Sequence, residues 1–125
     1  MDKFDYSYAE GKWTIKQIIQ HIIDAERIFA YRALRISRND KTPLPGFEED
    51  DYVNNTDAKS RSIQDLLSEF SAVRHSNLLM FKSFSDEQLR RIGIASGHEI
   101  SARALGFLII GHLKHHQKVF AERYL

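Results

Sequence analysis

The first long segment of regular hydrophobic spacing follows Trp13 and predicts an amphipathic helix that ends near Arg38. Thr14 and Gln17 have the spacing of a capping box at the start of this helix. Pro43, shortly after the last apolar position, limits how far the helix can extend. The apolar side chains recur at steps of three and four residues and so share one helix face: Ile15, Ile18, Ile19, Ile22, Ala25, Phe29, Ala33 and Ile36.

Two further segments with the same spacing predict two more long helices. One runs from about Ser62 to Phe84, and a capping-box spacing at Ser85 and Gln88 then predicts a short helix over 86–91. The other begins near Ser101 and continues to the C-terminus. No segment alternates between apolar and polar residues at every second position, so we expect no β-strand and assign the all-α class. The apolar stripes of these helices comprise Ile63, Leu66, Leu67, Phe70, Val73, Leu78 and Phe81 in the first, and Leu105, Leu108 and Ile109 in the second.

A long connection over residues 39–61 joins the first two long helices. It contains both prolines of the chain and the acidic run Glu48-Glu49-Asp50-Asp51. Connections longer than about 12–15 residues are uncommon in compact domains and are usually functional or disordered. Because Phe47 and Tyr52 flank the acidic run, we expect this connection to be held against the helices.

Three long helices leave a helical bundle without the fourth helix that would close its core. Residues 1–12 are too few to supply a helix of that length. The gap could be filled by the short turns after Ser85, by the 39–61 connection or by a second copy of the chain. We favour the second copy and therefore expect a homodimer. The fold predicted is an up-and-down helical bundle of three long helices, with the fourth missing or supplied by a partner chain.

Composition and charge exclude several classes of protein. The 125 residues make one domain, 1–125, and the 42% hydrophobic and 28% charged content is that of a globular protein. A net charge of +1 gives no electrostatic reason to expect binding to nucleic acid or to an anionic membrane. The chain has no cysteine, which excludes disulfides, cysteine-based metal sites and a cysteine nucleophile. The longest apolar stretch, 104–113, is too short to span a bilayer, and Asp2 and Asp5 are unlike a signal peptide, so we expect a cytoplasmic protein.

Two histidines on the last predicted helix have the spacing of metal ligands. His112 and His116 are one turn apart, about 40° around the helix axis, and lie in line with the apolar stripe. Together with a nitrogen from a facing helix they would make a three-histidine site, which leaves a position open for water or substrate. His21 lies at the edge of the apolar stripe of the first helix. Spacing alone favours this interpretation no more than the alternative, in which these are core histidines with hydrogen-bond partners.

The other three histidines are weaker candidates for metal ligands. His75 lies off the apolar stripe, and His98 follows Gly97 in a predicted turn, so we expect both in solvent; a place near the site is the less common alternative for His98. His115 is turned about 100° away from His116 around the helix.

Side chains near His21 that are candidates for acid–base chemistry are Gln17, Asp24 and Glu26; candidates for orienting an anionic substrate are Arg32, Arg35 and Arg74. For each of these six, a place on the helix surface or at its boundary is the more common role.

Five stretches of the sequence together resemble the DinB-like superfamily, in particular its YfiT-like branch of metal-dependent hydrolases. They cover nearly the whole chain: residues 11–16 leading to His21, then 24–27, 31–35, 43–47 and 111–116. The combination of a helix that starts with Lys-Trp and carries one histidine with a late His-x-x-x-His helix is specific, whereas either half alone would be weak. Members of this family normally carry a further helix before the Lys-Trp motif, and this sequence begins just ahead of that motif.

The resemblance implies a four-helix bundle that holds a divalent metal ion, often nickel or zinc, through three histidines. The ligand positions of the family fall on His21, His112 and His116, and His115 matches a position beside the site. Characterised relatives include transferases and isomerases that use low-molecular-weight thiols. A thiol would have to be a cosubstrate here, because the chain has no cysteine.

From the residues and the resemblance together we expect a metal-binding protein, either a metal-dependent hydrolase or a small-thiol-dependent transferase. The expected partners are a small-molecule or thiol substrate and a second copy of the chain. No catalytic residue besides the metal ligands is assigned, and no organic cofactor is expected. The alternative is a dimeric helical module that binds a metal or a ligand without catalysing a reaction.

Overall fold

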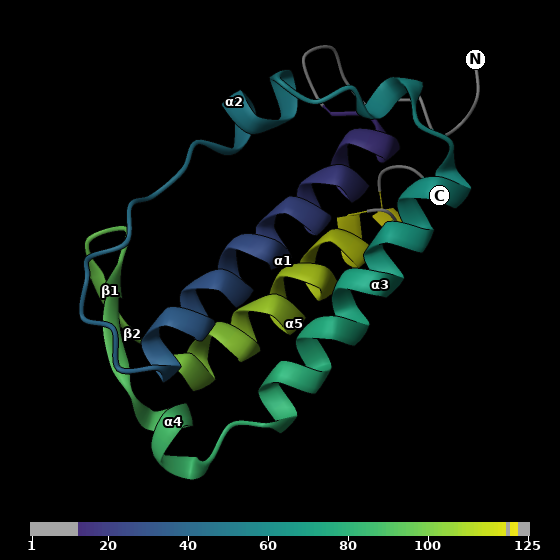
Figure 1. Cartoon of the computed structure of the whole chain (residues 1–125). Helices are drawn as coiled ribbons and strands as arrows, with labels where there is room; N and C mark the ends of the chain where they lie inside the picture. Colours follow the sequence, from purple (N-terminus) through teal and green to yellow (C-terminus); the bar gives the residue numbers. More distant parts are fainter. Residues whose placement is uncertain (1–12, 120, 123–125) are drawn as a thin grey trace.

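In the computed structural model, three long helices lie alongside one another (Figure 1). The structure describes residues 13–119 and 121–122. The long helices are α1 (Ile15–Ser37), α3 (Ile63–Lys82) and α5 (Ala102–Val119). The shorter elements are α2 (Glu49–Asn54), the 3-10 turn η2 (Ala58–Ser60), α4 (Asp86–Arg90), β1 (Ile92–Ala95) and β2 (His98–Ser101). The expectations that residues 1–12 supply no helix and that the last helix reaches the C-terminus fall on residues outside the described ones.

Both predicted capping boxes are present and fix where their helices begin. The backbone N–H of Gln17 donates to Thr14 Oγ1 at 3.2 Å, and the backbone N–H of Thr14 donates to Gln17 Oε1 at 2.9 Å. Ser85 and Gln88 repeat this pattern at 3.2 and 2.9 Å ahead of α4. These bonds satisfy backbone donors that have no partner within a helix, so the predicted starts of α1 and α4 are confirmed.

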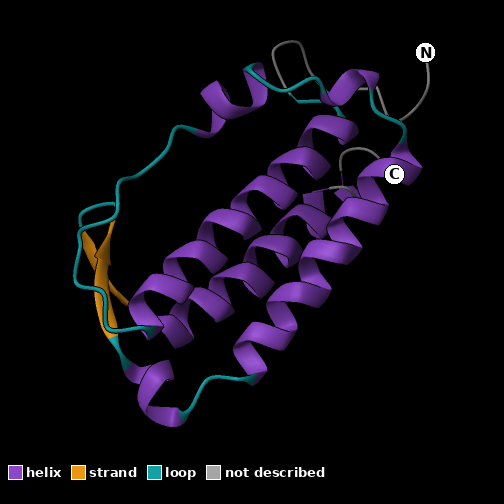
Figure 2. Ribbon diagram, in the orientation of Figure 1, coloured by secondary structure: helices purple, strands orange, loops and turns teal. Residues whose placement is uncertain are grey.

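A short antiparallel hairpin corrects the expectation that the chain has no strand (Figure 2). β1 pairs with β2 so that Ile92 lies opposite Ser101 and the strands close on a two-residue turn. Both turn residues have positive φ, 52° at Ser96 and 79° at Gly97. This is the backbone twist of the tight hairpin turns that glycine favours.

The hairpin was not predicted because its large apolar side chains face solvent and its small residues face the protein interior. Ile92 and Ile94 are exposed, whereas Gly93 and Ala95 face the protein interior. A four-residue strand with its smallest residues on the buried face gives no hydrophobic alternation. Gly93 has no room for a side chain because β1 lies close to α1: a Cβ on Gly93 would be 2.6 Å from Cγ1 of Ile36.

The connection between α1 and α3 is held against the helices, as predicted. Leu44 is buried and pairs with the hairpin: its N–H donates to the carbonyl of Ile94 at 2.9 Å. Arg32 of α1 donates to the carbonyl of Pro45 at 2.9 Å. The rings of Phe47 and Tyr52 lie 5.0 Å apart, and the connection forms α2 and η2 within its length. These contacts position α2 beside the first turns of α1 (Figure 1).

α1 is the central helix, and both α3 and α5 pack against it. One cluster of buried side chains joins α1 to α5 and to the connection between α3 and α4, and contains Ala33, Ile36, Phe84, Ala102 and Leu105. A second cluster joins α1 to α3, and contains Ile23, Leu66 and Val73. Each fully buried leucine or isoleucine contributes about 1.5–3 kcal/mol, so these clusters fix where the two outer helices lie on α1.

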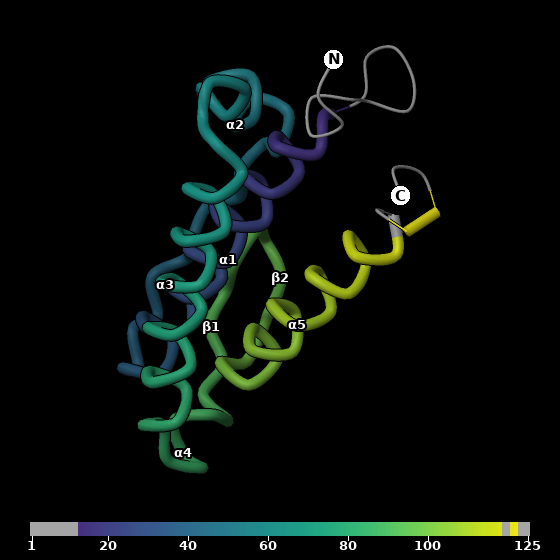
Figure 3. Tube along the Cα trace, turned by 90° about the vertical axis from the view of Figure 1, so that its right-hand side faces the viewer, coloured from purple at the N-terminus to yellow at the C-terminus, as the bar shows by residue number. Residues whose placement is uncertain are grey.

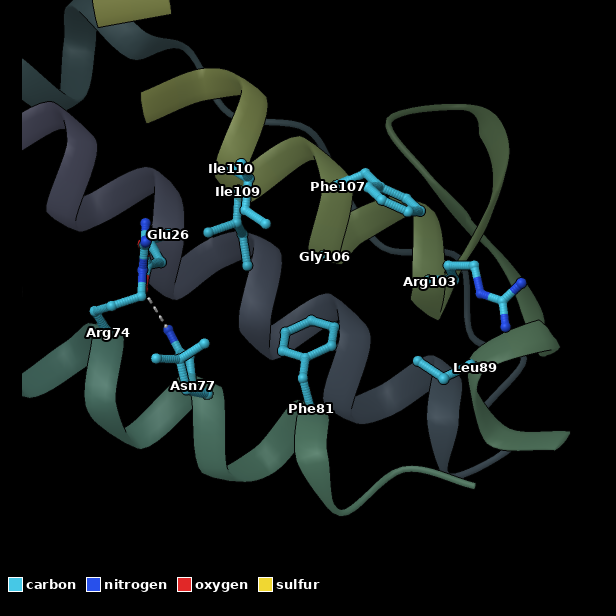
Figure 4. A pocket seen from close by; sticks show the side chains of 11 residues that line it. Glu26, Arg74, Asn77, Phe81, Leu89, Arg103, Gly106, Phe107, Ile109 and Ile110 are labelled. Atoms are coloured by element: carbon cyan, nitrogen blue, oxygen red, sulfur yellow. Dashed lines mark hydrogen bonds and ion pairs between the residues drawn. The ribbon is translucent and has the colours of Figure 1, made fainter. Parts of the chain in front are cut away.

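An apolar groove separates α3 from α5, which diverge in the side view of Figure 3. It holds a cavity of about 270 Å³. Figure 4 shows Phe81 of α3 and Ile109 of α5 pointing into it. Leu78, predicted on the buried stripe, lines this groove and is 53% exposed. We call this the α3–α5 groove; its large apolar lining residues are Leu78, Phe81, Leu89, Phe107, Ile109 and Ile110.

Two glycine-to-alanine changes should have opposite effects on stability. Gly93→Ala should lower the free energy of unfolding by about 1–3 kcal/mol, because the added methyl overlaps Ile36. Gly111→Ala should raise it by up to about 1 kcal/mol, since a Cβ there meets no atom within 4 Å and alanine favours a helix interior. Urea unfolding measures both. Equal effects of the two substitutions would contradict the close packing of β1 on α1.

Candidate metal centre

Three histidines from two helices meet at one end of the bundle. His21 lies in the second turn of α1, and His112 and His116 lie near the end of α5. The helices are antiparallel, so the start of α1 lies beside the end of α5 (Figure 1). Nε2 of His112 is 2.9 Å from Nε2 of His21 and 3.1 Å from Nε2 of His116. All three candidate ligand atoms lie within 4.8 Å of one another.

Aromatic rings enclose part of this cluster and keep it largely out of water. His21 is only 2% exposed, and His112 and His116 are half-buried. The Trp13 ring lies 4.9 Å from the His21 ring, and the Phe29 ring lies 6.0 Å from the His112 ring. The histidines are therefore held by packing, which is the condition for a preformed site.

Burial keeps the three imidazoles uncharged at neutral pH. Burial, with a smaller contribution from the neighbouring imidazoles, lowers the pKa of His21 to about 4 and that of His116 to about 3, while the carboxylate of Asp50 acts in the opposite direction on His21. The pKa of His112 is also lowered, mainly by burial and then by His115. A neutral imidazole can present a lone pair to a metal ion, whereas a protonated one cannot.

The donor set fits a metal ion better than it fits a hydrogen-bond network. Each Nε2 carries either one proton or one lone pair, so Nε2 of His112 cannot make two full hydrogen bonds with its two neighbours. A cation can accept all three lone pairs at once. Zinc binds imidazole nitrogens at about 2.0–2.1 Å, which puts tetrahedral ligand atoms about 3.3 Å apart. The separations of 2.9 and 3.1 Å are close to that spacing.

One acidic side chain at this cluster was not singled out by the sequence analysis. Oε1 of Glu49, the first residue of α2, lies 3.8 Å from Nε2 of His21. Because His21 is neutral at pH 7, this contact is not an ion pair there. The available signal was the acidic run in the 39–61 connection, but the sequence does not say which of its four carboxylates approaches a histidine.

The polar residues proposed near His21 have other partners. Gln17 caps α1, and Gln20 Nε2 donates to Asp24 Oδ1 at 3.0 Å. Glu26 is 2% exposed and is held by Arg74, whose Nη2 lies 2.7 Å from Glu26 Oε1, and by the side-chain amide of Asn77. These contacts account for the three side chains as structural groups, which is the more common role.

The candidate arginines also bond to protein groups. Arg32 donates to the carbonyl of Pro45 and to Ser96, Arg35 pairs with Asp40 at 2.7 Å, and Arg74 pairs with Glu26. His75 and His98 are exposed, as predicted, and His115 is exposed as well. The ring of His115 packs beside that of His116, with centroids 5.2 Å apart.

No helix within residues 13–119 is both long enough and apolar enough to cross a bilayer. This agrees with the sequence, whose longest apolar stretch is short. The cytoplasmic location stays a prediction.

The family follows from a comparison with known protein families. The model of the DinB superfamily matches residues 1–120, which is nearly the whole chain. The chain belongs to the DinB superfamily. The resemblance stated from the sequence is thereby confirmed.

Two known proteins are similar to this DinB-superfamily chain. A protein of Geobacillus thermodenitrificans (strain NG80-2), named "Putative metal-dependent hydrolase", is 28% identical over 119 residues. The match covers 92% of this chain and 66% of that relative, so the chain spans just under two thirds of its length. YfiT from Bacillus subtilis, described as a probable metal-dependent hydrolase with an unusual four-helix bundle topology, superimposes with a TM-score of 0.75. That match covers 95% of this chain and 71% of YfiT at 18% identity, which shows a shared fold and confirms the predicted bundle.

The histidine cluster should make the metal-free protein less stable in mild acid. Burial lowers the pKa values of His21 and His116 from 6.5 to about 4 and about 3, so the unfolded chain takes up protons that the folded chain does not. The neutral histidines therefore make their full contribution to the free energy of unfolding above pH 6.5, and that contribution is lost as the pH falls toward 4 for His21 and toward 3 for His116. Each such histidine contributes a slope of up to about 1.4 kcal/mol per pH unit.

Urea unfolding in the presence of chelator, from neutral pH down to about pH 5, measures this slope. His116→Gln should give a shallower dependence than the unsubstituted protein. Identical slopes for the two proteins would contradict the neutral, buried state of the cluster.

Proposed function

We propose that this protein is a metal-dependent hydrolase whose divalent ion is bound by His21, His112 and His116. The observation that carries the proposal is the convergence of three uncharged imidazole nitrogens from two helices. The name of the Geobacillus relative and the description of YfiT support the same reaction class. Nitrogen-only donors favour zinc or nickel over magnesium or calcium.

A divalent ion held by three imidazoles supplies an acidic water and polarises the carbonyl of an ester or amide substrate. The contribution of the chain is to hold the three nitrogens in place and uncharged. Packing between Trp13 and His21 and between Phe29 and His112 fixes the ring orientations. The partial exposure of His112 and His116 leaves part of the cluster accessible to solvent.

The decisive experiment is metal uptake and turnover by protein purified without a histidine tag and then stripped with chelator. Zinc or nickel should raise the melting temperature and restore hydrolysis of activated esters, because an ion at 100 times its Kd adds about 2.7 kcal/mol of stability. His112→Ala should abolish both effects. His75→Ala, which removes an exposed histidine from α3, is the matched control and should retain both.

A parallel assay with electrophiles and several small thiols tests the thiol-dependent transferase activity expected from the family. Turnover only in the presence of a thiol would replace hydrolysis by thiol transfer at the same centre. Equal metal binding by His112→Ala and by the unsubstituted protein would refute the metal centre itself.

The α3–α5 groove favours a second candidate function, in which the protein is a dimer that binds a metal or a ligand without catalysing a reaction. We propose that a second copy of the chain covers this groove. Phe107 is 69% exposed and stands beside the cavity of about 270 Å³, so one patch carries both a projecting ring and a hollow. A two-fold symmetric contact requires a self-complementary patch, and a projecting ring beside a hollow is one arrangement that meets this requirement. Glu26, the most buried of the charged residues that line the groove, is already paired with Arg74, so covering the groove leaves no unpaired carboxylate.

Sedimentation velocity tests this dimer. The unsubstituted protein should dimerise as its concentration rises, and Phe107→Glu should shift it to monomer, because the substitution places a charge in an apolar contact. Ile92→Glu is the control, since Ile92 is 50% exposed on β1, outside the groove. A monomer at every concentration, or an equal effect of the two substitutions, would contradict the proposal.

A further inference from the structure

We propose that Glu49 supplies a fourth protein ligand to the metal centre, so that the site has three nitrogen donors and one carboxylate oxygen. This inference rests on the proposed metal centre and adds a residue to it. Its basis is the position of Glu49 Oε1, 3.8 Å from Nε2 of His21. That nitrogen is the atom through which His21 faces the other two histidines.

The 39–61 connection brings Glu49 to the cluster through contacts on both sides of it. On the N-terminal side, Leu44 pairs with the hairpin and Arg32 donates to the carbonyl of Pro45. On the C-terminal side, Val53 is 2% exposed, and η2 packs against α1. With both sides fixed, the first residue of α2 is held next to His21. This gives the long connection a function that its length alone does not explain.

The chemistry of the side chain suits this role. Carboxylate oxygens bind zinc at about 2.0–2.2 Å, in sites that also contain histidine. The Glu49 side chain is 56% exposed and long, so it is free to change rotamer and bring an oxygen from the edge of the cluster toward its centre. One carboxylate beside three neutral imidazoles also offsets half the charge of a divalent ion. Zinc sites can expand to five ligands, so a fourth protein ligand still leaves room for substrate or water.

The four carboxylates of the acidic run are not equivalent in this respect. Glu49 is the one whose contact with a cluster histidine falls within ion-pair distance. Glu48, immediately before it, is the N-cap of α2 and makes no side-chain capping bond. Glu48→Gln therefore removes the same charge from the same segment without removing the proposed ligand, and it serves as the matched control.

Cobalt(II) titration of metal-stripped protein tests the inference, because the visible absorption of bound Co²⁺ depends on its ligands. Affinity is measured in parallel by competition with a chelator. Glu49→Gln should weaken Co²⁺ binding about tenfold or more and change the spectrum, while Glu48→Gln should leave the spectrum unchanged and the affinity within about threefold. Neither side chain is buried, so both variants should fold.

The outcomes separate this inference from the proposed function. If Glu49→Gln matches Glu48→Gln in affinity and spectrum, Glu49 is not a ligand, and the three-histidine centre stands. A weaker affinity with an unchanged spectrum would also overturn the inference, since the carboxylate would then act only through its charge. If the unsubstituted protein binds no Co²⁺, or His112→Ala binds it equally well, the metal centre fails and the role of Glu49 with it.

Discussion

The antiparallel packing of α1 against α5 is the contact on which the rest of the molecule depends. Ala33, Ile36, Ala102 and Leu105 are almost completely buried between the two helices, and their burial fixes the register of one helix along the other. That register brings His21, early in α1, to the last turns of α5. A slip of one helical turn, about 5.4 Å, would exceed the present separations between the ligand nitrogens and would separate the cluster. The histidine centre is therefore a consequence of apolar packing at the opposite end of the same interface.

The buried polar side chains form two sets with different roles, the Glu26 network and the histidine cluster. Glu26, Arg74 and Asn77 form a closed network, in which the buried carboxylate receives charge-assisted hydrogen bonds from two sides. Four contacts from Arg74 and Asn77 occupy the acceptor positions of the Glu26 carboxylate. The imidazoles differ, because Nε2 of His112 faces two other ring nitrogens and cannot make a full hydrogen bond with both. The contrast marks the histidine cluster as the chemical centre and the Glu26 network as a structural contact between α1 and α3.

The 39–61 connection links the fold to the candidate centre. It leaves α1 at one end of the bundle, pairs with the hairpin through Leu44, and returns along α1 to place α2 beside the histidines (Figure 1). Gly93 makes the first part of this path possible, because it lets β1 approach Ile36 closely. A hairpin with no evident chemistry of its own thus contributes to the position of Glu49.

The local features of this DinB-superfamily protein follow from its residues alone: three long helices, the capping boxes at Thr14 and Ser85, and the pairing of His112 with His116. Each depends on residues within about four positions, where helix geometry is fixed. Spacing did not decide whether His21 meets the pair, although the family resemblance implied it, because that distance depends on how α1 packs on α5. The hairpin and the approach of Glu49 were decided only by tertiary structure. Small residues on the buried face of β1 leave no hydrophobic signal, and four adjacent carboxylates look alike until the backbone path places one of them beside a histidine.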